Sequence, residues 1–186
     1  MTPTPRALAA TTVAALALAA LAGCSSSRAA GEPVTPDPAT VQAQKEAAKA
    51  AAYKGSEEAI RAYVADDKDR MTPAAGWYAA QSFIDEQQQV IDAIKKQKLT
   101  IKISSRLASI EPVDYQGPPM NQARMAVCMI VTGGVYDSKG RNVTVTPEGK
   151  PITDKERRIS SWFAMHKDST AQRWQIEHVT QRGTCS

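Results

Sequence analysis

The sequence has few of the residues on which most metal and catalytic sites depend. Its 186 residues include 2 His and 3 Cys. Zinc sites are built from Cys and His repeated at short spacings, and neither residue type recurs in that way here. No Gly-rich phosphate loop, Ser/His/Asp order or pair of catalytic carboxylates is present in recognisable form. We therefore predict no metal, no cofactor and no assigned catalytic residue.

The chain also lacks a strong charge excess. Lys and Arg number 23 against 19 Asp and Glu, which gives a net charge of +4, and aromatic residues make up only 5%. Nucleic-acid-binding surfaces need a concentrated basic stripe, preferably with aromatic residues between the charges. The densest basic cluster, Lys95, Lys96 and Lys98, ends a predicted helix, where the helix dipole favours cations. We expect no nucleic-acid partner.

The N-terminus lacks an apolar run long enough for a stable membrane span. Arg6 is the only charge before an Ala/Leu/Val run of about 16 residues at 7–22, whereas a spanning helix needs about 20. The run ends at Leu21-Ala22-Gly23-Cys24. This pattern is typical of an export signal that is cleaved. A permanent transmembrane helix is the weaker interpretation.

The Leu-Ala-Gly-Cys ending resembles the lipobox of bacterial lipoproteins, in which signal peptidase II cuts before the Cys and the sulfur carries a diacylglyceryl group. The resemblance implies that residues 1–23 are a signal peptide and that lipidation at Cys24 makes membrane lipid a partner. Two or three acyl chains hold a protein firmly at a membrane. The location implied is the extracytoplasmic face of the cell membrane. An ordinary secretory signal, cleaved nearby, is the alternative.

The segment that follows, residues 24–39, is rich in Ser, Ala and Pro and has almost no bulky apolar residue. Such a composition predicts a flexible tether, which would hold the folded domain at 40–186 roughly 20 Å from the membrane surface. An envelope protein, a polymer or a small ligand is the further partner that this location suggests.

The other two cysteines, Cys128 and Cys185, are predicted to form a disulfide, because disulfides persist in the compartments that receive exported proteins. The bridge would stabilise the fold by roughly 4 kcal/mol through chain entropy. A metal site or a nucleophilic Cys remains an alternative, less favoured because the chain has only 2 His.

Helical patterns come first along the folded part. Residues 40–67 are Ala-rich and carry an apolar stripe of Ile60, Tyr63 and Val64, with Gly55 as a candidate break. A second helix is predicted up to Lys98, with an apolar face that is expected to cover a sheet. The residues on that face are Trp77, Ala80, Ile84, Ile91 and Ile94.

After Lys98 the apolar period changes to 2, which is typical of strands. Strands are predicted around 99–104 and 125–131, with a turn at 137–140 and a long exposed loop at 146–157. A final hairpin is predicted to pair Met165 with Trp174, Phe163 with Ile176 and Ser161 with His178. That register places His178 on the apolar face, and Trp162 and His166 on the opposite face.

Helices followed by antiparallel strands predict an α+β fold with N-terminal helices packed on a curved antiparallel sheet. The helix order, the Cys in a central strand and the terminal Gly183-Thr184-Cys185 resemble the NTF2-like, cystatin-like cone of many secreted actinobacterial lipoproteins. The resemblance covers residues 44–185. It implies a cavity between sheet and helices, and the candidate pocket residues are Tyr63, Trp77, Tyr78, Met129, Trp162 and His178.

Two main hypotheses for function follow. The first is a lipoprotein of unassigned activity that serves as a non-catalytic binding or scaffold module at the cell envelope, motivated by the anchor, the tether and the missing catalytic set. The alternative is an NTF2-like pocket protein or enzyme in which His178 acts as general base with Tyr63 or an Asp. A third hypothesis, an assembly subunit of a secretion or conjugation machine, uses the same fold.

Overall fold

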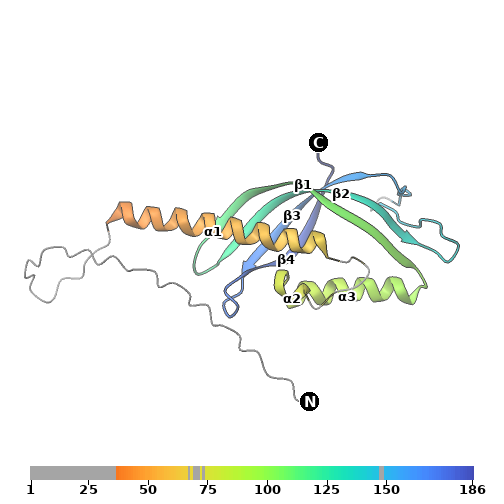
Figure 1. Cartoon of the computed structure of the whole chain (residues 1–186), viewed down its shortest axis with the longest axis horizontal. Helices are drawn as coiled ribbons and strands as arrows, with labels where there is room; N and C mark the ends of the chain where they lie inside the picture. Colours follow the sequence, from red (N-terminus) through yellow and green to blue (C-terminus); the bar gives the residue numbers. More distant parts are fainter. Residues whose placement is uncertain (1–36, 67, 69–71, 73, 147–148) are drawn as a thin grey trace, which may run out of the picture. The chain divides into compact units, whose positions relative to one another are not determined.

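The computed structural model describes residues 37–66, 68, 72, 74–146 and 149–186, which belong to one compact unit (Figure 1). The signal peptide, Cys24 and almost all of the predicted tether lie outside the described residues. Three helices precede four strands: α1 (Pro38–Ala65), α2 (Ala75–Tyr78), α3 (Gln81–Lys96), β1 (Thr100–Gln116), β2 (Gln122–Tyr136), β3 (Arg157–Lys167) and β4 (Trp174–Gly183).

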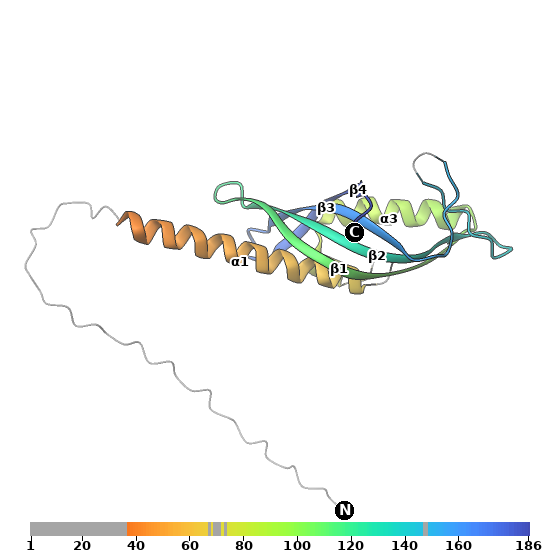
Figure 2. The same cartoon turned by 90° about the horizontal axis from the view of Figure 1, so that it is seen from above.

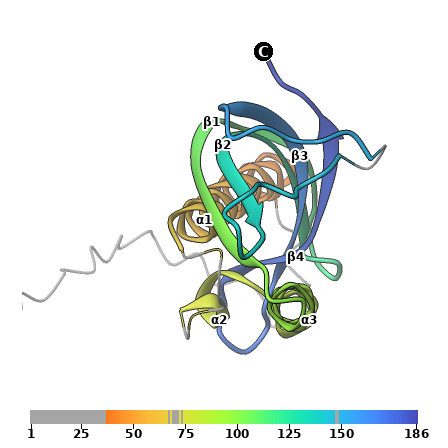
Figure 3. The same ribbon diagram turned by 90° about the vertical axis from the view of Figure 1, so that its right-hand side faces the viewer.

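The strands form one antiparallel sheet in the order β1-β2-β3-β4, and the helices pack against it. Figure 3 shows the twisted sheet end-on, with α1 and α3 on the same side of it. The prediction of an α+β fold with helices packed on an antiparallel sheet is confirmed. Strands that follow one another in the chain are also neighbours in the sheet, as is usual for antiparallel sheets with short connections.

Helix α1 is continuous through Gly55, so the predicted break there is wrong. A Cβ at this position would lie 2.6 Å from Cδ1 of Trp174, and the glycine therefore allows α1 to approach β4 closely. Only the C-terminal half of the helix is buried, beginning at Ala52, while residues 42–51 are exposed. Figure 2 shows this first part of α1 extending past the sheet.

The second predicted helix is interrupted. Ala79 forms a parallel bridge with Ile176 of β4, and the Ala80 amide donates to the Ile176 carbonyl at 2.9 Å. This contact with the sheet edge ends α2 and lets α3 start in a new direction. As a result Trp77 is 46% exposed and does not share the buried face of Phe83 and Ile91.

The core lies between the C-terminal half of α1, the start of α3 and the helix-facing side of β2, β3 and β4. Its largest fully buried hydrophobic side chains are Ile60, Met125, Phe163, Met165 and Ile176. Tyr63 lies at the edge of this core, and its ring makes edge contacts with Tyr78, Phe83 and Phe163 at centroid distances of 5.9, 5.8 and 5.7 Å. These rings fix the position of Tyr63.

The register predicted for the last hairpin is wrong. Met165 pairs with Ile176 rather than with Trp174, and the ladder continues to the pair Lys167–Trp174. Asp168 makes the tighter turn possible, because its amide donates to the Arg173 carbonyl at 2.8 Å and its carboxylate accepts from the backbone that follows. Trp174 and Ile176 still face the core as predicted, since the shift is two residues.

A β-bulge then reverses the faces of the rest of β4. Ala164 pairs with His178 and Met165 with Ile176, so Glu177 is the extra residue. One inserted residue moves every later side chain to the other face. Val179 therefore packs against the core, and His178 is exposed on the opposite face of the sheet.

The predicted disulfide between Cys128 and Cys185 is present, with the two Cα atoms 6.0 Å apart. It joins the C-terminal segment to the central strand β2. The turn at 137–140 is also confirmed, and the Asp137 carboxylate accepts from the amides of Lys139 and Arg141, both at 2.9 Å. In the part of the chain that the structure describes, no helix is both long and apolar enough to cross a membrane.

Candidate functional site

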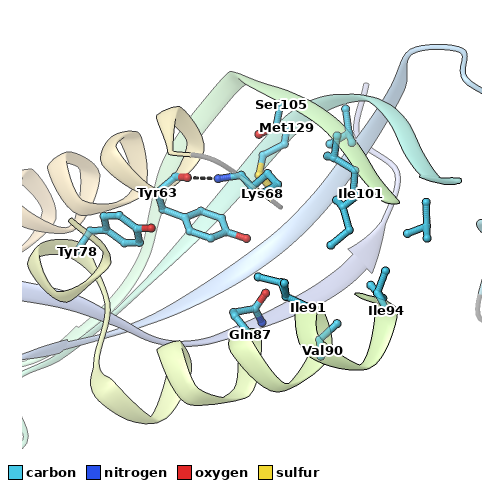
Figure 4. Close-up of a pocket in the computed structure, with 13 residues that line it drawn as sticks. Tyr63, Lys68, Tyr78, Gln87, Val90, Ile91, Ile94, Ile101, Ser105 and Met129 are labelled. Carbon is cyan, nitrogen blue, oxygen red and sulfur yellow. Dashed lines mark hydrogen bonds between the residues drawn. The ribbon is translucent and has the colours of Figure 1, made fainter. Parts of the chain in front are cut away.

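A pocket of about 220 Å³ lies between α3, the first half of β1 and the second half of β2 (Figure 4). It is reached from one side of α3, where Val90 is 52% exposed, and from β1, where Ile103 is 36% exposed. It is lined by Tyr63, Lys68, Tyr78, Gln87, Val90, Ile91, Ile94, Ile101, Ile103, Ser105, Met129, Val131 and Val135.

The long walls of the pocket are aliphatic, and the periodicity of each element explains why. On α3, Val90, Ile91 and Ile94 lie on one side because residues three and four apart share a helix face. On β1, Ile101 and Ile103 point the same way because alternate residues share a strand face. Two apolar surfaces thus face each other across an open space.

The end of the pocket nearest α1 is polar. The Lys68 ammonium donates to the Tyr63 carbonyl and lies 4.1 Å from the centroid of the Tyr63 ring. The Ser105 hydroxyl donates to the Val64 carbonyl at 3.4 Å. Burial raises the pKa of Tyr63, so its phenol keeps its proton at neutral pH. Figure 4 places Tyr63, Lys68 and Ser105 together at this end.

Tyr78 closes the same end of the pocket, and a small hydrogen-bond network holds it. Its hydroxyl donates to Oδ2 of Asp66 at 2.6 Å, and the Thr72 hydroxyl donates to the same oxygen at 2.7 Å. Burial raises the pKa of Tyr78, and its hydrogen bond to the Asp66 carboxylate raises it further. Tyr78 is therefore a fixed hydrogen-bond donor rather than a titrating group.

Three of the six candidate pocket residues line this pocket: Tyr63, Tyr78 and Met129. Trp77 does not, because the break between α2 and α3 leaves it in solvent. His178 does not, because the bulge in β4 turns it to the other face.

Trp162, the remaining candidate, lies on the sheet face away from the helices, which is the face that the sequence predicted for it, although its partner on β4 is Thr180. The guanidinium carbons of Arg124 and Arg182 are 5.1 and 4.2 Å from its ring centroid. These neighbours come from β2 and β4 on either side of β3. Trp162 therefore covers the outer surface of the sheet.

The sequence did not identify Lys68, Gln87 or the aliphatic walls as pocket residues. The stripe on α3 was predicted to cover the sheet, and an apolar stripe gives the same signal whether it is packed or lines an opening. Lys68 has no periodicity, because it follows the end of α1. Its position in the pocket is known only from the structure, in which the ammonium lies beside the Tyr63 ring.

The arrangement can bind an apolar molecule and hold a polar group at one end. Among the described lining residues none has a carboxylate or an imidazole, the side chains that most often transfer protons in catalysis. Within the described residues, no group of three His, Cys, Asp or Glu side chains gathers in a way that could hold a metal ion. The pocket can therefore provide a ligand with hydrophobic contacts and hydrogen-bond donors.

Comparisons with known proteins give no family. Neither a scan against family models nor a search of curated proteins found a match. Among solved structures, the intermembrane space region of the chloroplast protein ARC6 superposes with a TM-score of 0.41 at 8% identity, over 60% of this chain and 77% of that one. A similarity of this size carries no argument about function.

Proposed function

We propose that the protein is a membrane-anchored extracytoplasmic lipoprotein whose NTF2-like domain is a non-catalytic binding module for a small apolar ligand. The observation that carries the binding part is the pocket itself: aliphatic side chains of α3 and of the β1–β2 pair line an opening of about 220 Å³ instead of packing together. Protein interiors are normally close-packed, so an opening of this size between two apolar surfaces is unusual and supports a role in ligand binding.

The size of the pocket sets the size of the ligand. An engineered apolar cavity of about 150 Å³ binds benzene, and sites for drug-sized molecules run from about 300 Å³ upward. A single ring or a short aliphatic chain fits between these limits. Burying about eight methylene-sized groups contributes about 6 kcal/mol before the costs of association. We therefore expect dissociation constants in the micromolar to millimolar range.

The lining supports binding over acid–base catalysis. The enzyme alternative depended on His178, which is exposed on the far face of the sheet opposite Ala164. Tyr78 and Asp66 share a hydrogen bond of 2.6 Å, but the phenol is the donor and its pKa is raised. A phenol held in this way stays protonated at neutral pH and therefore cannot act as a general base.

The anchor is the second part of the proposal, and it rests on the sequence from Leu21 to Cys24. Helix α1 leads from the start of the described domain to Tyr63 at the pocket. From Asp37 to Tyr63 is 26 residues, or about 39 Å along the helix axis.

Calorimetric titration with 1-octanol tests the binding module, using the full chain with Cys24→Ser so that no attached lipid competes for the pocket. We expect one saturable site. Ile103→Trp should abolish it, because the indole would project into the opening, and Ile103 is exposed enough for the fold to tolerate the change. Val113→Trp, also exposed on β1 but outside the pocket lining, is the matched control. Absence of octanol binding, or equal binding to the Ile103 variant, would show that the opening is not a ligand site.

A further inference from the structure

Two polar groups in the pocket remain available to a ligand. They are the Tyr63 hydroxyl, which comes from α1, and the side-chain amide of Gln87, which comes from α3. Figure 4 shows both groups directed into the opening, each from its own helix. In the part of the chain that the structure describes, neither group has a hydrogen-bond partner. A ligand that fills the pocket would therefore meet a phenol and a carboxamide.

The other polar side chains of the lining already have partners within the domain. The Ser105 hydroxyl donates its proton to a backbone carbonyl of α1 at 3.4 Å. The Tyr78 hydroxyl donates to a carboxylate at 2.6 Å, and the Lys68 ammonium donates to a backbone carbonyl of α1. The selection of a ligand therefore falls to Tyr63 and Gln87.

This pair of groups fits an uncharged polar head that both accepts and donates hydrogen bonds. The Tyr63 phenol keeps its proton at neutral pH and is a donor, whereas the Gln87 amide has two N–H donors and an acceptor oxygen. A primary carboxamide on the ligand matches both groups. Its oxygen can accept from the phenol and from one Gln87 N–H, while its own N–H donates to the Gln87 oxygen.

A carboxylate fits this end of the pocket less well. It is only an acceptor, so it would leave the Gln87 oxygen without a donor. It would also lose its hydration beside aliphatic walls, which is costly for a charged group. A ketone avoids the second cost but still lacks the donor.

The walls beyond the polar groups favour an aliphatic chain. From Gln87 to Ile94 the α3 wall spans seven residues, about 10 Å along the helix. The strand residues that face it are Ile, Val, Met and Ser, and the aromatic rings of Tyr63 and Tyr78 belong to the end nearest α1. A chain that starts at Gln87 would run along these aliphatic side chains.

We propose that the ligand is a primary carboxamide on a short aliphatic chain, with the amide group at Tyr63 and Gln87 and the chain along α3. This inference rests on the proposed function, because it assigns a chemical class to the same pocket. Gln87 selects the amide, and the Ile and Val walls accept the chain.

The test compares three ligands that have the same alkyl chain and nearly the same shape: octanamide, 2-nonanone and octanoate. Calorimetric titrations use the full chain with Cys24→Ser at neutral pH. We expect octanamide to bind about tenfold or more tightly than either of the others, because only its head donates to Gln87. The chain contributes equally in all three, so the differences report on the head group.

Gln87→Met should reduce the preference for octanamide over 2-nonanone to within about threefold, because the paired amide is lost and the side-chain length is kept. Gln89→Met is the matched control: it makes the same change at an exposed position of α3 outside the pocket lining and should leave the preference unchanged. Tyr63→Phe keeps the ring but removes the hydroxyl. It should weaken octanamide and 2-nonanone by the same factor, because both carbonyls accept from the phenol.

The outcomes separate the two proposals. If the compounds bind but octanamide binds no more tightly than 2-nonanone, or if octanoate binds most tightly, the amide assignment is overturned and the binding module stands. A preference for octanamide that survives Gln87→Met would overturn the assignment in the same way. If none of the three compounds binds, the proposed function itself fails.

Discussion

Removing the Cys128–Cys185 bridge should destabilise the domain strongly. The bridge joins β2 to the segment after β4, and the loop that it closes contains all of β3 and β4. Cys185→Ser is the cleaner variant, because Cys185 is half-buried whereas Cys128 is only 6% exposed. A Ser at position 128 would add the cost of a buried hydroxyl to the loss of the bridge.

The magnitude follows from the 57-residue separation of the two cysteines. In the chain-entropy model a closed loop of this length removes about 14 cal/mol/K from the unfolded state, which is about 4 kcal/mol at 25 °C. For a domain of this size each kcal/mol shifts Tm by about 2–4 °C. The expected fall in Tm is therefore about 8–16 °C.

Thermal melts followed by circular dichroism measure the effect, on the wild type and on Cys185→Ser, each with and without a reductant. Oxidised wild type should melt highest, and reduced wild type should melt within about 2 °C of the variant, on the same entropy argument. The variant should not respond to the reductant. Equal melting temperatures for oxidised and reduced wild type would refute the reasoning, because the bridge would then contribute no measurable stability.

Two further predictions concern the N-terminus and the contact between α1 and β4. Mass spectrometry of the membrane fraction from a bacterial host should find a diacylglyceryl group on Cys24 as the first residue; an unmodified protein released into the medium would contradict the anchor. Gly55→Ala should lower Tm, because a Cβ 2.6 Å from Cδ1 of Trp174 costs about 1–3 kcal/mol of overpacking against a gain of about 1 kcal/mol in helix propensity. Gly76→Ala, where no atom lies within 4 Å of the new Cβ, should be neutral or stabilising, and a higher Tm for the Gly55 variant would show that Trp174 moves aside freely.

Periodicity gave most of the secondary structure but not its interruptions. The 3.6-residue stripe of α3 and the alternation at Ile101 and Ile103 are local properties, and both elements form where they were predicted. The break between α2 and α3 depends on a hydrogen bond from Ala80 to Ile176, 96 positions later in the chain. The local sequence at Ala79 and Ala80 contains no signal that predicts this partner.

The candidate site likewise combines features that the sequence predicted with features that it did not. Tyr63 and Met129 were expected on apolar faces, and they line the pocket. His178 was assigned to that face by counting alternate residues, and a single extra residue at Glu177 reversed the assignment. A bulge leaves little trace in sequence, because it depends on how two strands fit together rather than on which residues they contain.

The sequence by itself determined the α+β class and the pairing of Cys128 with Cys185, because these follow from local periodicity and from the small number of cysteines. Only the tertiary structure decided that α3 and the β1–β2 pair enclose an opening, and that Lys68 lies beside Tyr63 at its end. Hydrophobic patterning tells which side of an element avoids water. Whether two such sides touch or leave room for a ligand depends on the distance between them, and that distance is set by contacts elsewhere in the fold.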